Sequence, residues 1–295
     1  MNKYVILGHE NPDFDSIVSG YILEKIMKRH GYKVEFIIPD EQIEEENIKL
    51  SAYIGINPTH FQKSLSEDPK IKYILVDHHE RVVPGEIIAI IDHHPTDKKI
   101  SCKHYQNQSA CSTSCIIGRG NERQLSYDDI KAICLSAMVD TAGFHSTKTK
   151  LSDYLWVKYL CEKYKFNYQE LINIAMLPTD IEDLKKASLN GLKTYNINNQ
   201  KIASSYIHIS NPSEKETEIN TMRMHIQEHI ITEEYDLFAF IVHDITNFKT
   251  TLYKITATET EITQYGEYTS RGSKIIPDIT KSIKNPQKKK TIEAQ

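Results

Sequence analysis

Two short segments of this chain contain the same three residues, Asp-His-His. The first, ILVDHHE, covers residues 74–80, and the second, AIIDHHP, covers residues 89–95. Each triplet follows a run of apolar residues of the kind that forms a buried strand. Carboxylate and imidazole groups suit Mn²⁺, Mg²⁺, Co²⁺ or Zn²⁺ as ligands. The two segments are therefore two copies of one metal site, two parts of a single site, or a coincidence.

Other acidic and imidazole groups accompany these triplets. The segment GHENPDFDS, residues 8–16, contains His9, Asp13 and Asp15 directly after a short apolar run. Asp13 and Asp15 could alternatively serve only as a helix cap and as an acidic residue of a first turn. Asp140 lies within an apolar stretch, where an ionised carboxylate is costly unless a cation compensates it. The carboxylates outnumber what one ion needs, and two ions about 4 Å apart, bridged by one carboxylate, would use them all.

The elements expected around these residues decide whether they can meet. A helix is predicted over residues 14–31, where apolar residues recur at helical spacing, Asp13 can cap the start and Gly31 can end it. Apolar runs predict four strands, at residues 4–8, 33–39, 72–77 and 86–92. This alternation predicts an α/β fold with a parallel sheet and helices on both faces. Ligands bind at the carboxyl ends of strands in such sheets, so the candidate residues are expected at one edge.

The chain changes character near residue 178. Five more helices are expected before that point, at residues 41–55, 109–120, 126–144, 151–165 and 167–177. Beyond it, a helix is expected at 213–230 and strands at 201–209, 235–245 and 250–258. We therefore predict a metal-binding catalytic domain over residues 1–178, a smaller α+β domain over 185–285, and a polar tail over 286–295.

Composition excludes several classes of partner. The 295 residues carry a formal net charge of −4, which offers no basic field for nucleic acid. No apolar run approaches the roughly 20 residues that a membrane span needs, and the N-terminus turns polar too quickly for a signal peptide. The five cysteines form an odd set without a Cys-x-x-Cys motif, which favours reduced thiols in the cytoplasm. Cys111 and Cys115 have the spacing of ligands on a helix, but small buried residues fit that pattern better.

Four segments, taken in their order and spacing, make the chain resemble a known family. GHENPDFDS, LVDHHE, IIDHHP and MVDTAGF resemble the DHH phosphoesterase superfamily, and within it the family II, manganese-dependent inorganic pyrophosphatases. The resemblance implies that Asp77 bridges two ions, that His94 contacts the substrate phosphate or assists proton transfer, and that six residues are metal ligands: His9, Asp13, Asp15, Asp77, His93 and Asp140. His9 and Asp13 would hold one ion, and Asp15, His93 and Asp140 would hold the other.

The C-terminal part resembles the DHH-associated domain of the second type, which implies an active site in the cleft between two domains. Lys193, in NGLKTY, and Arg271, in SRGSKIIP, would clamp phosphate oxygens. The family's Ser-Arg-Lys signature has Gly272 in place of the Lys. Lys274 would replace that cation if the segment is a strand, because positions 272 and 274 would then share a face. His79 stands where the pyrophosphatases usually have Asn, and is either a metal contact or a residue supporting the ligands.

The resemblance implies hydrolysis of inorganic pyrophosphate to two phosphates. A hydroxide generated by two metal ions would attack, with Mn²⁺ as the expected metal and Co²⁺ or Mg²⁺ as alternatives. A related alternative is an exopolyphosphatase or short-chain polyphosphatase, suggested by Gly272. A different class is a non-catalytic metal- or nucleotide-binding module. The remaining expectations are a small-molecule phosphoanhydride substrate, a homodimer formed through the N-terminal domain, and a cytoplasmic location.

Overall fold

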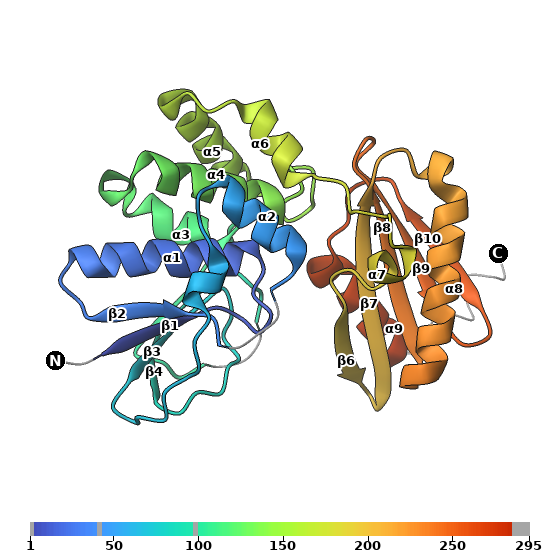
Figure 1. Cartoon of the computed structure of the whole chain (residues 1–295), viewed down its shortest axis with the longest axis horizontal. Helices are drawn as coiled ribbons and strands as arrows, with labels where there is room; N and C mark the ends of the chain where they lie inside the picture. The colour runs from blue at the N-terminus through green and yellow to red at the C-terminus, as the bar shows by residue number, and fades with distance from the viewer. Residues whose placement is uncertain (1–2, 40–42, 97–99, 285–295) are drawn as a thin grey trace. The chain divides into compact units, whose positions relative to one another are not determined.

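The computed structural model describes residues 3–39, 43–96 and 100–284, and the predicted polar tail lies outside them. The chain forms two compact units (Figure 1). The first unit comprises residues 1–144 and 148–175, and the second comprises residues 145–147 and 176–295. Each unit is built around a five-stranded sheet of its own. The predicted fold class, a parallel-sheet domain followed by a smaller domain with its own sheet, is therefore confirmed.

The sheet of the first unit is entirely parallel, in the strand order β2-β1-β3-β4-β5. Its strands are β1 (Tyr4–Leu7), β2 (Val34–Ile37), β3 (Lys72–Val76), β4 (Glu86–Asp92) and β5 (His104–Asn107). The four apolar runs form strands as predicted. The strand β5 was not predicted, because HYQN is polar and lies at an edge, where three of its four residues are exposed.

The helices of the first unit begin at sequence signals that could be recognised. They are α1 (Phe14–Arg29), α2 (Glu45–Tyr53), α3 (Thr113–Arg119), α4 (Tyr127–Asp140), α5 (Leu151–Tyr164) and α6 (Tyr168–Ala175), with short 3₁₀ turns at Pro58–Phe61 and Glu122–Gln124. Asp13 caps α1 by accepting a hydrogen bond from the Ser16 N–H, and Gly31 follows its end with φ of +79°. Ser126 and Asp129 form a capping box at the start of α4.

The two faces of this sheet are covered differently. The helices lie together on one side of it (Figure 1). On the other side, buried strand residues such as Tyr73 and Leu75 pack against Leu65, Val83 and Ile100 from connecting segments. In the described part of the chain, connecting segments thus replace the second layer of helices that the strand and helix order predicted.

The sheet of the second unit is mixed, in the order β10-β9-β8-β7-β6, with only β7 and β8 parallel among its pairs. Its strands are β6 (Lys193–Ile197), β7 (Gln200–Ile209), β8 (Leu237–Asp244), β9 (Lys249–Ile255) and β10 (Thr260–Tyr265). Its helices are α7 (Leu184–Ser188), α8 (Glu216–Glu233) and α9 (Ile276–Lys284), with a 3₁₀ turn at Pro212–Lys215. Apolar residues of α8 pack on one face of the sheet and those of α9 on the other.

The condition under which Lys274 would replace the missing lysine is not met. Residues Arg271–Ile275 form a single wide helical turn that leads into α9, and not the strand on which that replacement depended. Positions 272 and 274 therefore do not share a strand face. The geometric reason for Lys274 to replace the family's lysine at position 272 is lost. Lys274 instead forms an ion pair with Asp278 one turn on, with 3.1 Å between Nζ and Oδ2.

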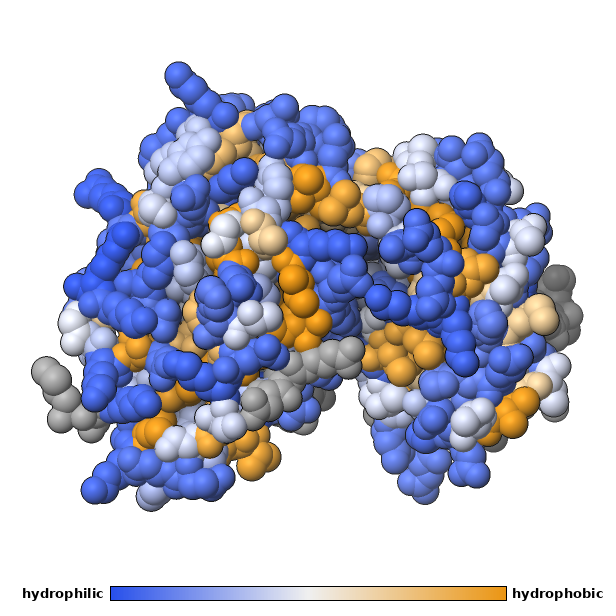
Figure 2. Space-filling model, viewed as in Figure 1, coloured by the Kyte–Doolittle hydropathy of each residue, from blue (hydrophilic) through white to orange (hydrophobic). Residues whose placement is uncertain are grey.

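The surface agrees with the polar composition. Hydrophilic residues cover most of the face seen in Figure 2, on both units. Among the helices that the structure describes, none combines the length and the apolar character needed to cross a bilayer. All five cysteines are free thiols, and four of them are buried, including Cys111 and Cys115. This pair occupies apolar core positions, which agrees with the prediction that Cys111 and Cys115 are small buried residues.

Candidate metal centre

The candidate ligands gather where β1, β3 and β4 end. His9 and Asp13 lie on the loop after β1, Asp77 directly follows β3, and His93 directly follows β4. Asp15 lies in the first turn of α1, and Asp140 is the last residue of α4. Because parallel strands place their carboxyl ends at one edge, three segments that are distant in sequence meet there.

Asp77 is the centre of this cluster. Its Oδ2 lies 3.8 Å from Nε2 of His9, and its Oδ1 lies 3.4 Å from Nε2 of His93. On the first side, His9 Nε2 is also 3.0 Å from Asp13 Oδ2. On the second side, His93 Nε2 is 3.3 Å from Asp140 Oδ2. Each oxygen of one carboxylate therefore faces a different group of ligands.

Three groups of atoms in this cluster could hold a metal ion, and two of them share no residue; the third, Asp77, His93 and His94, overlaps with both. The ligand atoms of His9, Asp13 and Asp77 all lie within 4.8 Å of one another. So do the ligand atoms of a second group, Asp15, His93 and Asp140. The structure thus brings together all six residues that the sequence proposed as ligands. The two Asp-His-His triplets contribute different residues to one cluster, Asp77 from the first and His93 from the second.

The chemistry of these donors favours a cation. The Asp77 side chain is only 1% exposed, and its pKa is raised well above the usual value by burial and by the charges of Asp15 and Asp13. A buried cluster of carboxylates is costly without positive charge, and a divalent ion would remove that cost. Carboxylate and imidazole donors without thiolate suit Mn²⁺, Mg²⁺ or Co²⁺. The residues present therefore fit a centre for divalent ions.

Asp15 is held by groups that the sequence did not reveal. Its Oδ2 accepts the Thr113 N–H at 2.6 Å, and its Oδ1 accepts the Ser114 N–H at 3.1 Å, both from the start of α3. The hydroxyl of Ser136, on α4, donates to Oδ1 at 2.7 Å. Asp15 is 3% exposed, so it is not merely a surface acid in a first turn. Asp13 combines both of its predicted roles, because Oδ1 caps α1 while Oδ2 faces His9.

A second acidic residue, Asp92, organises the histidines beside the cluster. It is fully buried and accepts hydrogen bonds from His79 Nδ1 at 2.6 Å and from His94 Nδ1 at 2.9 Å. Burial would raise the Asp92 pKa, but the hydrogen bonds from His94 and His79 outweigh it, so the pKa is lowered. Burial likewise opposes protonation of His94, whose pKa is nevertheless raised by Asp92 and Asp77. His79 therefore supports Asp92 and belongs to neither ligand group.

The cluster also contains a lysine that no sequence pattern marked. Lys148 lies between α4 and α5, and its Nζ is 3.2 Å from Oδ2 of Asp140. The same oxygen faces His93. Positive charge is therefore already present on one side of the carboxylate cluster.

Two of the predicted phosphate-binding cations, Lys193 and Arg271, lie in the second unit and are connected through the turn at Gly191. Arg271 Nη1 donates a hydrogen bond to the Gly191 carbonyl oxygen, and its guanidinium carbon lies 5.2 Å from the centre of the Tyr206 ring. Lys193 is exposed at the start of β6, two residues after Gly191. Gly191 has φ of +60°, and a Cβ there would lie 2.3 Å from the Tyr206 ring. One tight turn thus positions Arg271 and begins the strand that carries Lys193.

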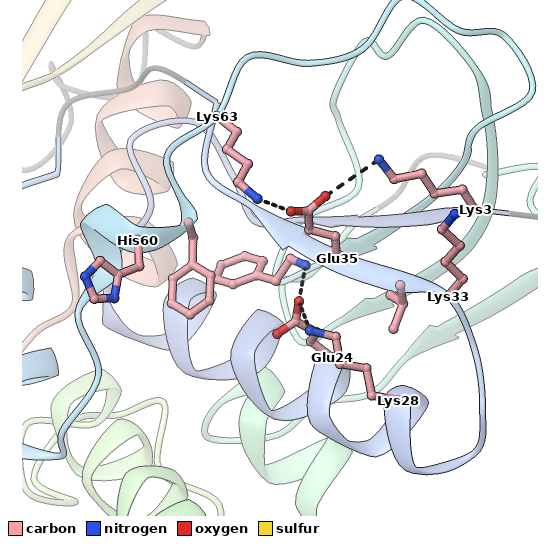
Figure 3. A pocket seen from close by; sticks show the side chains of 10 residues that line it. Lys3, Glu24, Lys28, Lys33, Glu35, His60 and Lys63 are labelled. Carbon is pink, nitrogen blue, oxygen red and sulfur yellow. Dashed lines mark hydrogen bonds and ion pairs between the residues drawn. The ribbon is translucent and has the colours of Figure 1, made fainter.

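A separate pocket of about 440 Å³ opens beside the edge strand β2 (Figure 3). It is lined by four lysines, Lys3, Lys28, Lys33 and Lys63. Glu35 pairs with Lys3 and Lys63, and Glu24 pairs with Lys28 at 3.0 Å. Glu24 also accepts the Phe36 N–H at 2.9 Å, a group that an edge strand would otherwise offer to another chain. These ion pairs cover the strand edge and involve no residue of the metal centre.

Comparison with known proteins identifies the class of the first unit. Residues 3–139 match the model of the DHH family, N-terminal domain. This region contains five of the six candidate ligands, and the sixth, Asp140, follows it directly. This match and the curated relatives confirm the resemblance to the DHH family that was inferred from the motifs.

Curated relatives extend the similarity to almost the whole chain. The chain is 24% identical over 312 aligned positions to the probable manganese-dependent inorganic pyrophosphatase of Streptococcus pyogenes serotype M49, covering 96% of this chain and 99% of that protein. It is 26% identical over 269 positions to the manganese-dependent inorganic pyrophosphatase of Methanocaldococcus jannaschii, covering 82% and 83%. The crystal structure of a proposed family II inorganic pyrophosphatase from Methanococcus jannaschii has a TM-score of 0.71 at 21% identity, covering 95% and 99%. That structure supports the fold.

Proposed function

We propose that this protein hydrolyses inorganic pyrophosphate to two phosphates, using divalent metal ions bound at the cluster around Asp77. The observation that carries the proposal is the division of ligands on either side of this one carboxylate, since Oδ2 faces His9 and Oδ1 faces His93. That arrangement suits two ions that share a ligand. The relatives that cover the chain supply the substrate and the metal, because they are named manganese-dependent inorganic pyrophosphatases.

In this proposal, His9, Asp13 and Asp77 would hold the first ion, and Asp15, His93 and Asp140 would hold the second, with Asp77 serving both. Such ions lower the pKa of water toward neutrality and offset charge on phosphoryl oxygens. The chain keeps the ligands in place through short hydrogen bonds. Ser16 donates to Asp77 at 2.7 Å, and the start of α3 holds Asp15. This support reduces the reorganisation needed when substrate binds.

His94 is proposed to contact a substrate phosphate. Its Nδ1 is fixed by Asp92, which leaves Nε2 to donate a hydrogen bond, and its side chain is 44% exposed beside the buried ligands. Charge from Asp92 and Asp77 favours the protonated ring, which suits an anionic partner.

Lys193 and Arg271 are proposed to bind phosphate oxygens from the second unit. The planar guanidinium of Arg271 can hold two oxygens, and the Gly191 carbonyl and the Tyr206 ring restrict its orientation. An Arg271→Lys variant should raise KM for pyrophosphate and retain both ions, because a lysine cannot reproduce the two-point contact. Metal analysis together with steady-state kinetics separates these effects. Loss of an ion in this variant would contradict the assignment.

A short-chain polyphosphatase or exopolyphosphatase is the second candidate function. Gly272 favours it, because a side chain built at that position meets no atom within 4 Å. Gly272 places no second cation next to Arg271 in the sequence, and such a looser clamp would accept a longer anion. The two candidates are distinguished by kcat/KM on pyrophosphate and on tripolyphosphate.

The central experiment is phosphate release by purified protein with Mn²⁺, Mg²⁺ or Co²⁺, using pyrophosphate, tripolyphosphate and long-chain polyphosphate. We expect Mn²⁺ with pyrophosphate to give the highest kcat/KM and two phosphates per substrate. A higher kcat/KM on longer chains would establish the second candidate instead. Retained ions with no turnover of any phosphoanhydride above an Asp15→Ala control would indicate a non-catalytic metal-binding module.

We also infer a cytoplasmic homodimer. Five free thiols support the reducing compartment. The edge strand β5 is exposed in the first unit, whereas ion pairs and the Glu24 carboxylate occupy the edge of β2. Association through the first unit would therefore use β5 more readily than β2. Light scattering during gel filtration tests the inference, and a monomer at micromolar concentration would contradict it.

A further inference from the structure

Lys148 introduces a charge that the metal centre itself does not require. The four carboxylates among the proposed ligands, Asp13, Asp15, Asp77 and Asp140, carry four negative charges. Two divalent ions would neutralise all four. The ammonium of Lys148, 3.2 Å from Asp140, would then give these groups a net positive charge before a hydroxide or a substrate anion binds. A surplus cation beside metal ions is unfavourable unless an anion also binds there.

The surroundings of Lys148 support a partner beyond Asp140. Its charge interacts with those of Asp77 and Asp13 as well as with that of Asp140, so it faces the interior of the cluster. Its side chain is 20% exposed, whereas that of Asp77 is 1% exposed. The second unit offers no lysine at Gly272, and Lys274 is paired with Asp278. A polyanionic substrate would therefore gain from a cation supplied by the first unit.

We propose that Lys148 binds a phosphate oxygen of the substrate on the Asp140 side of the metal centre. This assignment rests on the proposed phosphoanhydride hydrolysis and adds a substrate-binding residue to it. The competing role is structural: Lys148 would only orient Asp140 so that the carboxylate can bind an ion. The two roles predict different effects on metal binding and on anion binding.

The test replaces Lys148 by Met and measures two affinities by calorimetry. The first is the affinity of metal-free protein for Mn²⁺, and the second is the affinity of Mn²⁺-loaded protein for imidodiphosphate, a pyrophosphate analogue that resists hydrolysis. We expect Mn²⁺ affinity to stay the same or rise, because a like charge is removed. We expect imidodiphosphate affinity to fall by about 10- to 100-fold, the worth of one charge-assisted hydrogen bond. KM for pyrophosphate should rise correspondingly.

Lys150→Met is the matched control, since it removes the same charge from an exposed position at the start of α5. It should leave both affinities within about twofold, because a solvated charge contributes little to binding. Lys148→Gln tests the same point with a polar side chain if the Met variant does not fold. Lys148→Arg keeps the charge and should recover most of the imidodiphosphate affinity.

Two results overturn the assignment while leaving the proposed function intact. One is unchanged imidodiphosphate affinity in the Met and Gln variants of an active enzyme. The other is a tenfold or greater loss of Mn²⁺ affinity, which would show that Lys148 acts by orienting Asp140. If the unaltered protein itself releases no phosphate from any phosphoanhydride, the proposed function fails first, and the inference fails with it.

Discussion

Two strand ends in this protein have nearly the same sequence and different surroundings. The strand β3 leads into Val-Asp-His, where Asp77 lies between two groups of ligand atoms. The strand β8 ends in Val-His-Asp, where Asp244 accepts the N–H groups of Thr246 and Asn247 at 2.9 and 3.0 Å and closes a turn. An aspartate and a histidine at a strand end therefore become a metal-type site only where other acidic segments converge on them.

The histidines of the two units differ in the same way. In the first unit, His93 and His94 face carboxylates. In the second unit, His208 and His243 lie buried on neighbouring strands, and Tyr268 contacts both. Burial lowers the pKa of His208 to about 4 and holds that of His243 well below its ordinary value. The first pair, His93 and His94, lies where it can carry charge or bind an ion. The second pair, His208 and His243, is neutral and packs in the core of its unit.

The largest expected effect separates the two aspartates. Asp77→Asn should lose at least one Mn²⁺ ion and reduce kcat/KM for pyrophosphate by about 10³-fold or more, because several kcal/mol of charge stabilisation disappear. Asp244→Asn is the matched control at the other strand end. It should keep both ions and the activity, and lose at most about 1 kcal/mol of stability from its turn. Metal analysis and phosphate release measure both, and a complete metal centre in Asp77→Asn would falsify the sharing of this residue.

The next effect concerns the buried imidazole of His208. Above pH 6.5 it is neutral in both the folded and the unfolded chain. As the pH falls from 6.5 to about 4, the unfolded chain binds a proton at His208 and the folded unit does not. The free energy of unfolding therefore decreases by about 3 kcal/mol over this range and then levels off.

An NMR titration of the His208 ring in metal-free protein measures this directly. Urea unfolding of the unaltered protein and of His208→Asn, at pH 7 and at pH 4.5, tests the energetic consequence. The variant should lose less stability over this range than the unaltered protein. An imidazole that titrates near pH 6.5 would show that the second pair of histidines is not held neutral.

A smaller effect is expected from His79, which acts through Asp92. His79→Ala should reduce kcat by about 10- to 100-fold with both ions retained, as changes beside metal ligands typically do. His60→Ala, an exposed histidine of the first unit, serves as the control and should have no effect. Loss of an ion in His79→Ala would mean that the first Asp-His-His triplet contributes two ligands.

The smallest effect is expected from Lys274. Its ammonium pairs with Asp278 on a helical turn, and its side chain is 54% exposed. Lys274→Ala should change kcat/KM by less than about threefold, because exposed ion pairs contribute 0–1 kcal/mol. Steady-state kinetics on pyrophosphate and tripolyphosphate check it. A loss of tenfold or more on either substrate would restore Lys274 as a substrate-binding residue.

The sequence predicted the candidate ligands better than the groups that support them. Asp77 and His93 could be placed because apolar runs reveal strands, and a parallel order brings strand ends together. The groups that hold Asp15, such as the Thr113 N–H and the Ser136 hydroxyl, lie on helices whose approach depends on packing. Lys148 stands among other lysines and threonines, and only the folded chain brings it to Asp140.

Strands at sheet edges were the main omission in the fold. The strands β5, β6 and β10 all lie at edges, and each contains polar residues that face solvent, so none shows an apolar run. The element at 271–275 was left open, because a short apolar segment near a proline is compatible with a strand and with a helical turn. Sequence patterns report burial, and edge strands are where burial is weakest.

The backbone at Asp77 limits how this centre could be redesigned. Its φ of +66° lies in the left-handed region, which glycine, asparagine and aspartate enter at the least cost. Of these three, only aspartate presents a carboxylate with two oxygens. A glutamate would keep the charge, but it would strain the main chain and move its oxygens outward. An engineer who wishes to change the spacing between the ligand groups must therefore rebuild the loop after β3.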